Sequence, residues 1–121
     1  MKSYIILGSV LTGIAIVIGA FGAHAIKIKV SVEDLAIFET GVKYHFYHSL
    51  GLIIIGILGF YYPPDVVQIS GKLFILGILI FSGSLYLLVL TNLRWLGAIT
   101  PIGGFCYIIG WFILAYNIYK T

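Results

Sequence analysis

One stretch decides the fold of this chain: YIILGSVLTGIAIVIGAFGAHA, residues Tyr4–Ala25. It contains no aspartate, glutamate, lysine or arginine, and a helix of this length crosses the hydrocarbon core of a bilayer. Lys2 in front of it and the Ala-His-Ala tripeptide at its end also resemble a signal peptide. The apolar part is longer than the roughly 7–15 residues usual in signal peptides. We therefore expect a retained membrane-spanning helix.

The composition of the whole chain agrees with a membrane protein. Of 121 residues, 61% are hydrophobic and 9% are charged, and the mean hydropathy is +1.14. Soluble domains carry about 25% charged residues. The seven lysines and arginines stand singly at segment ends, which is typical of lipid headgroup anchors and excludes a nucleic-acid-binding stripe. The single cysteine, Cys106, excludes an internal disulfide.

Three further apolar runs predict three more spans, at Tyr44–Tyr62, Lys72–Thr91 and Leu96–Asn117. Each is close to the roughly 20 residues that a spanning helix needs, and none alternates with the period of a strand. Because lipid offers the backbone no hydrogen-bond partner, each run is expected to be a helix. Short links make neighbouring helices antiparallel. We predict an all-α integral membrane protein, a single domain over residues 1–121 that forms an antiparallel four-transmembrane-helix bundle.

The one long link, Ile26–Lys43, carries the signature of a helix of its own. Ser31 is a typical N-cap residue, and the acids Glu33 and Asp34 follow it in what would be the first turn. From Val32 onward, apolar residues recur at helical spacing between polar ones. This pattern predicts a short amphipathic helix in the interface before the second span.

The antiparallel path brings most polar residues to one end of the bundle, where the first and third links lie. Thr40, Tyr44 and His48 share one helix face, because they are four residues apart. Ionisable groups within membrane segments mark functional sites by default. The candidate ligand-binding or structural polar cluster at this end consists of His24, Thr40, Tyr44, His48, Arg94 and Thr100.

Several kinds of chemistry can be weighed for this cluster. His45 and His48 could present two nitrogens to a metal, with His24 as a third, but no acid lies within a span. A bis-histidine haem would need His24 and His48 at matched depth. No activated nucleophile is present, which disfavours an enzyme. We expect no catalytic residue, no metal and no cofactor. A hydrogen-bonded clamp between helices, or a pocket for a lipid headgroup lined by Arg94 and Lys27, remain as alternatives.

Four motifs, in this order, resemble a known family: GAFGAH (19–24), FETGVKY (38–44), FSGSLY (81–86) and GAITPIGG (97–104). The sequence is similar over almost its whole length to the small bacterial membrane proteins whose family also contains eukaryotic transmembrane protein 256. The resemblance implies a four-helix integral membrane protein of no settled activity. In this family pattern a glutamine is common where this chain has His45. The departure therefore favours His24 and His48 as the site histidines.

The sequence leaves three classes of function open. We expect a non-enzymatic structural or accessory component of a membrane complex, in contact with the lipid bilayer and with other membrane subunits or copies of itself. The alternative is a module that binds or transports a lipid or small amphipathic ligand through the polar cluster. The third is haem or metal binding through histidines. The expected location is the bacterial cytoplasmic (inner) membrane, with both termini in the cytoplasm because proteins with an even number of spans commonly have them there.

Overall fold

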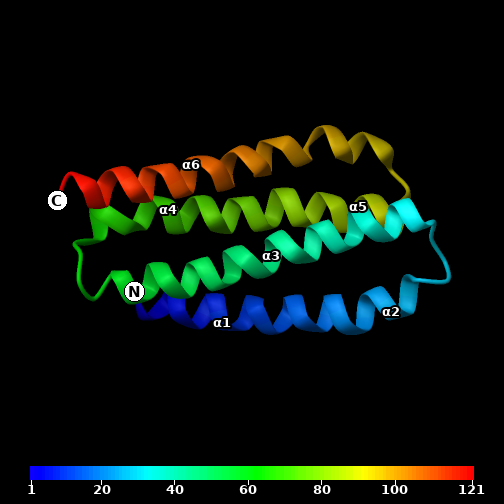
Figure 1. The fold of residues 1–121 in the computed structure, drawn as a ribbon, viewed down its shortest axis with the longest axis horizontal. Helices are drawn as coiled ribbons and strands as arrows, with labels where there is room; N and C mark the ends of the chain where they lie inside the picture. The colour runs from blue at the N-terminus through cyan, green and yellow to red at the C-terminus, as the bar shows by residue number, and fades with distance from the viewer.

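The computed structural model describes residues 1–121 as four long helices joined by short links, without a strand (Figure 1). The predicted all-helical class is confirmed. The first long helix consists of α1 (Lys2–Val17), a π-helical turn η1 (Ile18–Gly22) and α2 (Ala23–Ile26). The second is α3 (Val32–Leu58), and the third consists of α4 (Pro64–Gly77), a second π-helical turn η2 (Ile78–Ser82) and α5 (Gly83–Thr91). The fourth begins with a 3₁₀ turn, η3 (Arg94–Ala98), and continues as α6 (Thr100–Tyr119).

Three of these four helices are long and apolar enough to cross a membrane: Lys2–Ile26, Pro64–Thr91 and Arg94–Tyr119. The helix α3 is not among them, although it is 27 residues long. Its residues 32–48 include four charged side chains and two histidines, which lower its hydropathy. The structure thus supports a helical membrane protein with three apolar spans, and the role of α3 depends on how it packs.

The short amphipathic helix expected before the second span is not a separate element. The Ser31 hydroxyl accepts a hydrogen bond from the Asp34 backbone N–H at 3.1 Å, so the predicted N-cap is present. From there the helix runs without interruption to Leu58. No proline breaks it, and Gly41 is buried against the Tyr86 ring in a regular helix. The amphipathic segment is therefore the first part of α3.

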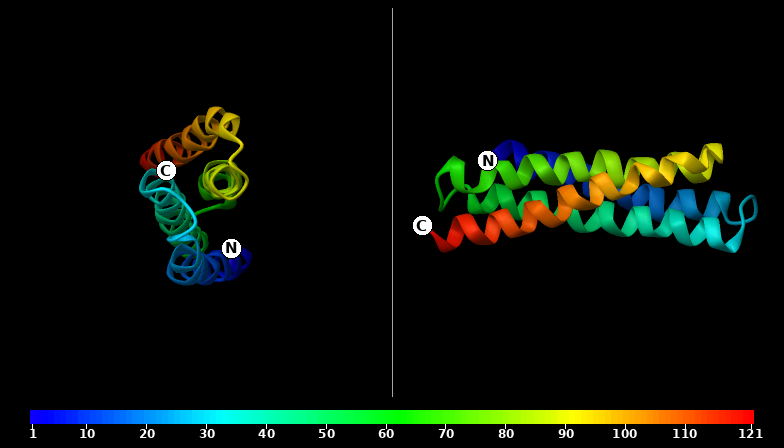
Figure 2. Two further views of the ribbon diagram at one scale, coloured as in Figure 1. Left: turned by 90° about the vertical axis from the view of Figure 1, so that its right-hand side faces the viewer. Right: turned by 90° about the horizontal axis from the view of Figure 1, so that it is seen from above.

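The helices run antiparallel, and both termini lie at the same end of the molecule (Figures 1 and 2). The helix α3 packs against α1 on one side and against α4, η2 and α5 on the other, while α6 packs on α4 and η2. The first and fourth helices are therefore the outer ones. We refer to the end that holds the termini as the terminal end, and to the end with residues 27–31 and 92–93 as the loop end.

Small residues allow close approach between the helix backbones. A Cβ atom added at Gly8 would lie 2.7 Å from the carbonyl oxygen of Ser49, so α1 and α3 are nearly in backbone contact. The small-residue seam Ala15-xxx-Gly19-xxx-Ala23 lies on the same side. Ala15 is fully buried, and a Cβ atom at Gly19 would meet the Val42 side chain at 2.8 Å. Glycine seams of this kind replace the hydrophobic driving force that helices lack in lipid.

The interior has two apolar clusters separated by polar groups. The larger cluster lies toward the terminal end and consists of Leu52, Ile55, Val66, Val67, Phe74, Ile78, Tyr107 and Leu114. The smaller lies toward the loop end and consists of Phe38, Leu88, Val89 and Leu96. Between them along the helices stand buried polar residues, which we call the polar belt: His45, His48, Ser49, Ser82, Ser84 and Thr100.

Candidate functional site

His48 occupies the centre of the polar belt and is 4% exposed. Its ring stacks on the Tyr107 ring of α6, with centroids 3.5 Å apart and planes at 11°. The Phe74 ring of α4 meets it edge-on at 5.2 Å. Nδ1 of His48 lies 2.8 Å from the Tyr44 carbonyl oxygen, and Nε2 lies 3.0 Å from the indole nitrogen of Trp111. One imidazole therefore connects α3 with both α4 and α6.

These contacts define the protonation of the His48 ring. An indole N–H can only donate, so Nε2 of His48 must accept from Trp111, and the proton sits on Nδ1 and is donated to the Tyr44 carbonyl. The ring is neutral in this arrangement, and both nitrogens have a partner. A metal or haem iron would need the same Nε2 lone pair, so the contact with Trp111 competes directly with ligation.

Other members of the polar belt also join helices. The Ser82 hydroxyl, placed by the π-helical turn η2, donates to the Gly41 carbonyl of α3 at 2.7 Å. The hydroxyls of Ser84 and Thr100 are 2.6 Å apart and connect α5 to α6. Buried hydroxyls in a membrane interior need such partners, because lipid supplies none. Each of these bonds crosses between two helices, as expected of groups that hold a bundle together.

His45 is the one belt histidine with an unsatisfied nitrogen. Its Nδ1 lies 2.9 Å from the Tyr86 hydroxyl of α5, whereas its buried Nε2 has no hydrogen-bond partner. The residue is 3% exposed, so water does not reach that nitrogen directly. His45 therefore contributes a contact between α3 and α5, one turn before His48 on α3.

At the loop end, Arg94 forms the chain's ion pair. Its Nη1 and Nη2 donate to the two carboxylate oxygens of Asp34 at 2.8 and 2.7 Å, and its Nε donates to Oδ1 of Asn92 at 2.8 Å. Asn92 ends α5 in the left-handed conformation, with φ 59°, which asparagine adopts more readily than most residues. A bidentate pair of this kind fixes the relative orientation of the two side chains and also stabilises their contact. Three of the five guanidinium N–H groups are thus already engaged.

The six residues of the predicted polar cluster do not form one site in the structure. Tyr44 and His48 lie together, through the bond to the Tyr44 carbonyl. Thr100 pairs with Ser84, and Arg94 with Asp34. The other two take no part in these contacts, because Thr40 bonds the Ala36 carbonyl within its own helix, and His24 is exposed on α2 without a hydrogen bond.

Sequence comparison identifies the chain. Residues 18–104 match the family model described as "Protein of unknown function (DUF423)". The chain belongs to this family. It is 47% identical over 120 residues to the UPF0382 membrane protein SH2409 of Staphylococcus haemolyticus, covering 99% of this chain and 98% of that one. It is 44% identical over 115 residues to the UPF0382 membrane protein YwdK of Bacillus subtilis, covering 94% of each. No solved structure matches the chain.

The predicted resemblance to an uncharacterised family of small bacterial membrane proteins is therefore confirmed. All four motifs that carry it lie inside the DUF423 match, which covers residues 18–104. The relatives are membrane proteins by name, in agreement with the three apolar helices. The family description states no activity, so function must be argued from the contacts of this chain.

The histidines of this DUF423 member do not assemble a metal centre. No group of three or more His, Cys, Asp or Glu side chains lies close enough together to hold a metal ion. His24 points from the exposed surface of α2, and His48 has both nitrogens engaged deep in the bundle. His24 and His48 are therefore not placed to bind one metal or haem iron together.

Sequence reasoning missed the partners of the two most important polar side chains. Trp111 lies in an apolar run, but its N–H needs an acceptor, and His48 is one of few in the membrane interior. The sequence pattern places Asp34 only in the first turn of a helix, yet it is one of the four acids of the chain and pairs with Arg94. An unmatched donor in each case was the signal that could have found the pair.

The ion pair predicts a pH dependence at the loop end. The hydrogen bond from Arg94 lowers the pKa of the Asp34 carboxyl, which lies outside the membrane-spanning segments. A carboxyl with a lowered pKa stabilises the fold above its unfolded pKa of about 3.9, and this contribution is lost as the pH falls through the lower folded value. We expect faster hydrogen exchange of the backbone amides of residues 93–98 under those acidic conditions, after correction for intrinsic rates.

The variant Asp34→Asn provides the control for this pH effect. It removes the titrating group, so its exchange at residues 93–98 should be fast at neutral pH and unchanged by acid. A wild-type chain with no acid-dependent change in this segment would contradict a structural role for the pair.

Proposed function

We propose that this protein crosses the bacterial cytoplasmic (inner) membrane four times and acts as a non-enzymatic structural or accessory component of a membrane complex. One observation carries the proposal: several buried polar side chains join one helix to another. His48 joins α3 to α6 through Trp111, and Ser82 joins η2 to α3. Bonds of this kind hold a bundle of membrane helices together, as a structural role requires.

The packing of α3 supports it as the fourth span. It lies antiparallel to the first helix along its length, and that helix is a candidate membrane span (Figure 1). The two histidines within the proposed span, residues 44–62, are covered by protein, since His45 is 3% and His48 4% exposed. Polar residues in membrane helices face the bundle interior for this reason. A helix that is too polar to meet lipid on all sides can span the bilayer when its neighbours shield it.

The outer helices support a role in assembly. In the most apolar 18-residue stretch of each span, 11% of the first helix is buried inside the chain. The share is 22% for the fourth helix and 39% for the third. Large apolar and aromatic side chains cover these outer surfaces, among them Phe21, Phe105 and Phe112. Such surfaces can face lipid or other subunits. A small protein that offers two unshielded helices is suited to bind beside larger partners.

Co-purification tests this function. A tagged chain, expressed at its native level and extracted in mild detergent, is expected to retain one or more membrane proteins in fixed ratio, identified by mass spectrometry. The matched baits are Gly104→Ala, expected to fold normally, and Gly103→Ala, expected to be destabilised by overpacking of α6 against Phe81. Partners should be retained by the first and reduced with the second. A solitary chain in both the wild type and Gly104→Ala would contradict the proposal.

A further inference from the structure

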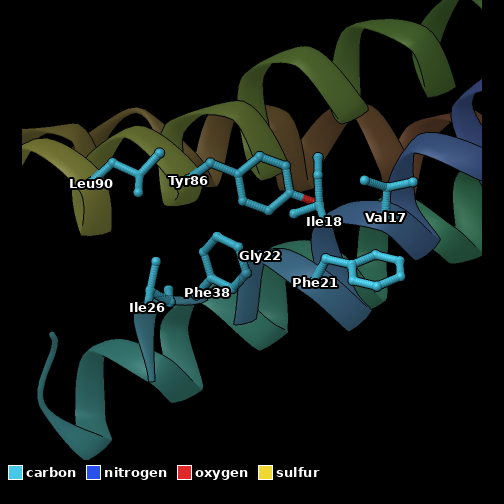
Figure 3. Close-up of a pocket in the computed structure, with 8 residues that line it drawn as sticks. All are labelled: Val17, Ile18, Phe21, Gly22, Ile26, Phe38, Tyr86 and Leu90. Atoms are coloured by element: carbon cyan, nitrogen blue, oxygen red, sulfur yellow. The ribbon is translucent and has the colours of Figure 1, made fainter. Parts of the chain in front are cut away.

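The structure contains one pocket, of about 300 Å³, in the part of the bundle near the loop end. It lies between the first helix and α5, over α3, as Figure 3 shows. The lining residues are Val17, Ile18, Phe21, Gly22, Ile26, Phe38, Tyr86 and Leu90. Gly22 has no side chain to place in this space, and the Phe38 ring forms its floor. The hollow remains because the first helix and α5 both pack on α3, with no large side chain filling the gap.

The chemistry of the lining favours a purely apolar occupant. Apart from Gly22, every lining residue is hydrophobic. The one polar atom nearby, the Tyr86 hydroxyl, is already engaged by Nδ1 of His45 at 2.9 Å. A ligand with hydrogen-bonding groups would lose its water here without gaining a partner, which is costly. A hydrocarbon chain has no hydrogen bonds to lose when it enters the pocket.

The shape of the pocket matches a chain that lies along the membrane normal. On the first helix the lining residues extend from Val17 to Ile26, about 13 Å at 1.5 Å per residue. On α5 they extend in the same direction from Tyr86 to Leu90. Ile26 is the last residue of α2, so the pocket reaches the loop end of the bundle. One end of the occupant therefore lies in the membrane interior and the other at the headgroup level.

Positive charge stands where the pocket reaches the surface. Lys27 and Lys29 follow Ile26 directly and are exposed. Neither belongs to the ion pair of the chain, which joins Arg94 to Asp34. Lysines at this level attract anionic lipid headgroups. The acids Glu33 and Glu39 are also exposed, on α3, whose Phe38 forms the pocket floor, whereas the two lysines follow the wall of the pocket at its loop end.

We propose that this pocket binds one acyl chain of an anionic phospholipid whose phosphate is held by Lys27 and Lys29. The lipid fills the gap between the first helix and α5 and so completes the packing of the outermost helix. This inference goes beyond the proposed role in a complex and does not depend on it, since the site requires the folded chain in a bilayer and no protein partner.

Photo-crosslinking tests the acyl-chain site. The full-length chain is reconstituted into phosphatidylcholine vesicles that contain a phosphatidylglycerol with a diazirine in the middle of one acyl chain. Crosslinks are expected on the peptides that contain residues 17–26 and 86–90. Gly22→Leu should reduce them by at least about fivefold, because the leucine side chain occupies the pocket. A Cβ at Gly22 meets Phe38 at an ordinary 3.4 Å, so the first atom of the new side chain fits beside the Phe38 ring.

Gly13→Leu is the matched control, because it makes the same substitution on the same helix where a Cβ meets nothing within 4 Å. Its crosslinking should equal that of the wild type. Leu90→Trp fills the pocket from the α5 side, and it tests the site independently if Gly22→Leu fails to fold. Labelling that spreads evenly over the lipid-facing surface, or that neither filling variant reduces, would overturn the site. A dimer of the chain joined at the pocket residues by a bifunctional protein crosslinker would overturn it as well.

The headgroup is tested by comparing lipids with the same labelled chain. The wild type should crosslink phosphatidylglycerol at least about threefold more than phosphatidylcholine, because two lysines meet the anionic headgroup. The double variant Lys27→Gln/Lys29→Gln should crosslink both lipids equally and still label the same peptides. Equal labelling of the two lipids by the wild type would overturn the assignment of an anionic headgroup.

Discussion

Replacing Gly103 by alanine is expected to lower the free energy of unfolding by at least about 2 kcal/mol, through overpacking between α6 and η2. An added Cβ at this position would lie 2.3 Å from the backbone nitrogen of Phe81 and 2.8 Å from its Cα. Backbone atoms within a helix cannot move aside as a flexible side chain would, so the two helices must separate. The loss can be measured by thermal or detergent-induced unfolding followed by circular dichroism.

Gly104→Ala is the control, one residue farther along the same helix. Its Cβ would meet only the Phe81 ring at an ordinary 3.7 Å. Alanine is favoured over glycine within a helix by up to about 1 kcal/mol, so this variant should unfold at the same point as the wild type or later. Equal stability of the two alanine variants would contradict the close packing of α6 on η2.

Replacing His48 by alanine is expected to cost about 3 kcal/mol or more, which is in the range for removing a large buried ring. The substitution leaves a cavity between Tyr107 and Phe74 and removes the acceptor of the Trp111 indole. His48→Phe should cost less, because it keeps the stacking on Tyr107 and loses only the hydrogen bonds, worth about 1 kcal/mol each. Unfolding of the purified protein in detergent measures both.

His24→Ala is the matched control for this histidine, because His24 is exposed and forms no hydrogen bond. It should leave stability unchanged. A second readout follows the indole itself: in a Trp95→Phe background, Trp111 is the only tryptophan, and its emission should shift when His48 is removed but not when His24 is. If His24→Ala were as harmful as His48→Ala, the clamp described for His48 would be wrong.

The placement of the polar groups was predictable only in part. The apolar runs correctly predict an all-helical membrane protein, and the Ser31 cap is present as expected. Sequence spacing correctly places His48 one turn from Tyr44, because both lie on one helix. It could not pair His48 with Trp111 or Arg94 with Asp34, since these contacts join residues 63 and 60 positions apart.

The π-helical turns also escaped prediction. Each inserts extra backbone into a helix and so turns the following residues onto a different face. In η2 this places Ser82 against the Gly41 carbonyl, and η1 and α2 contribute to one wall of the pocket. No residue pattern in these apolar segments signals such a turn, because apolar residues are present on every side.

The sequence by itself determined that the chain is helical and belongs in a membrane, because hydropathy and backbone hydrogen bonding in lipid are local properties of each segment. The motifs also determined its family. Only the tertiary structure decided which helix is shielded, which polar groups meet and where a pocket remains. A helix that is apolar on every side carries no signal for its rotation about its axis, and that rotation is set by close contacts such as Gly103 against Phe81 and His48 against Tyr107.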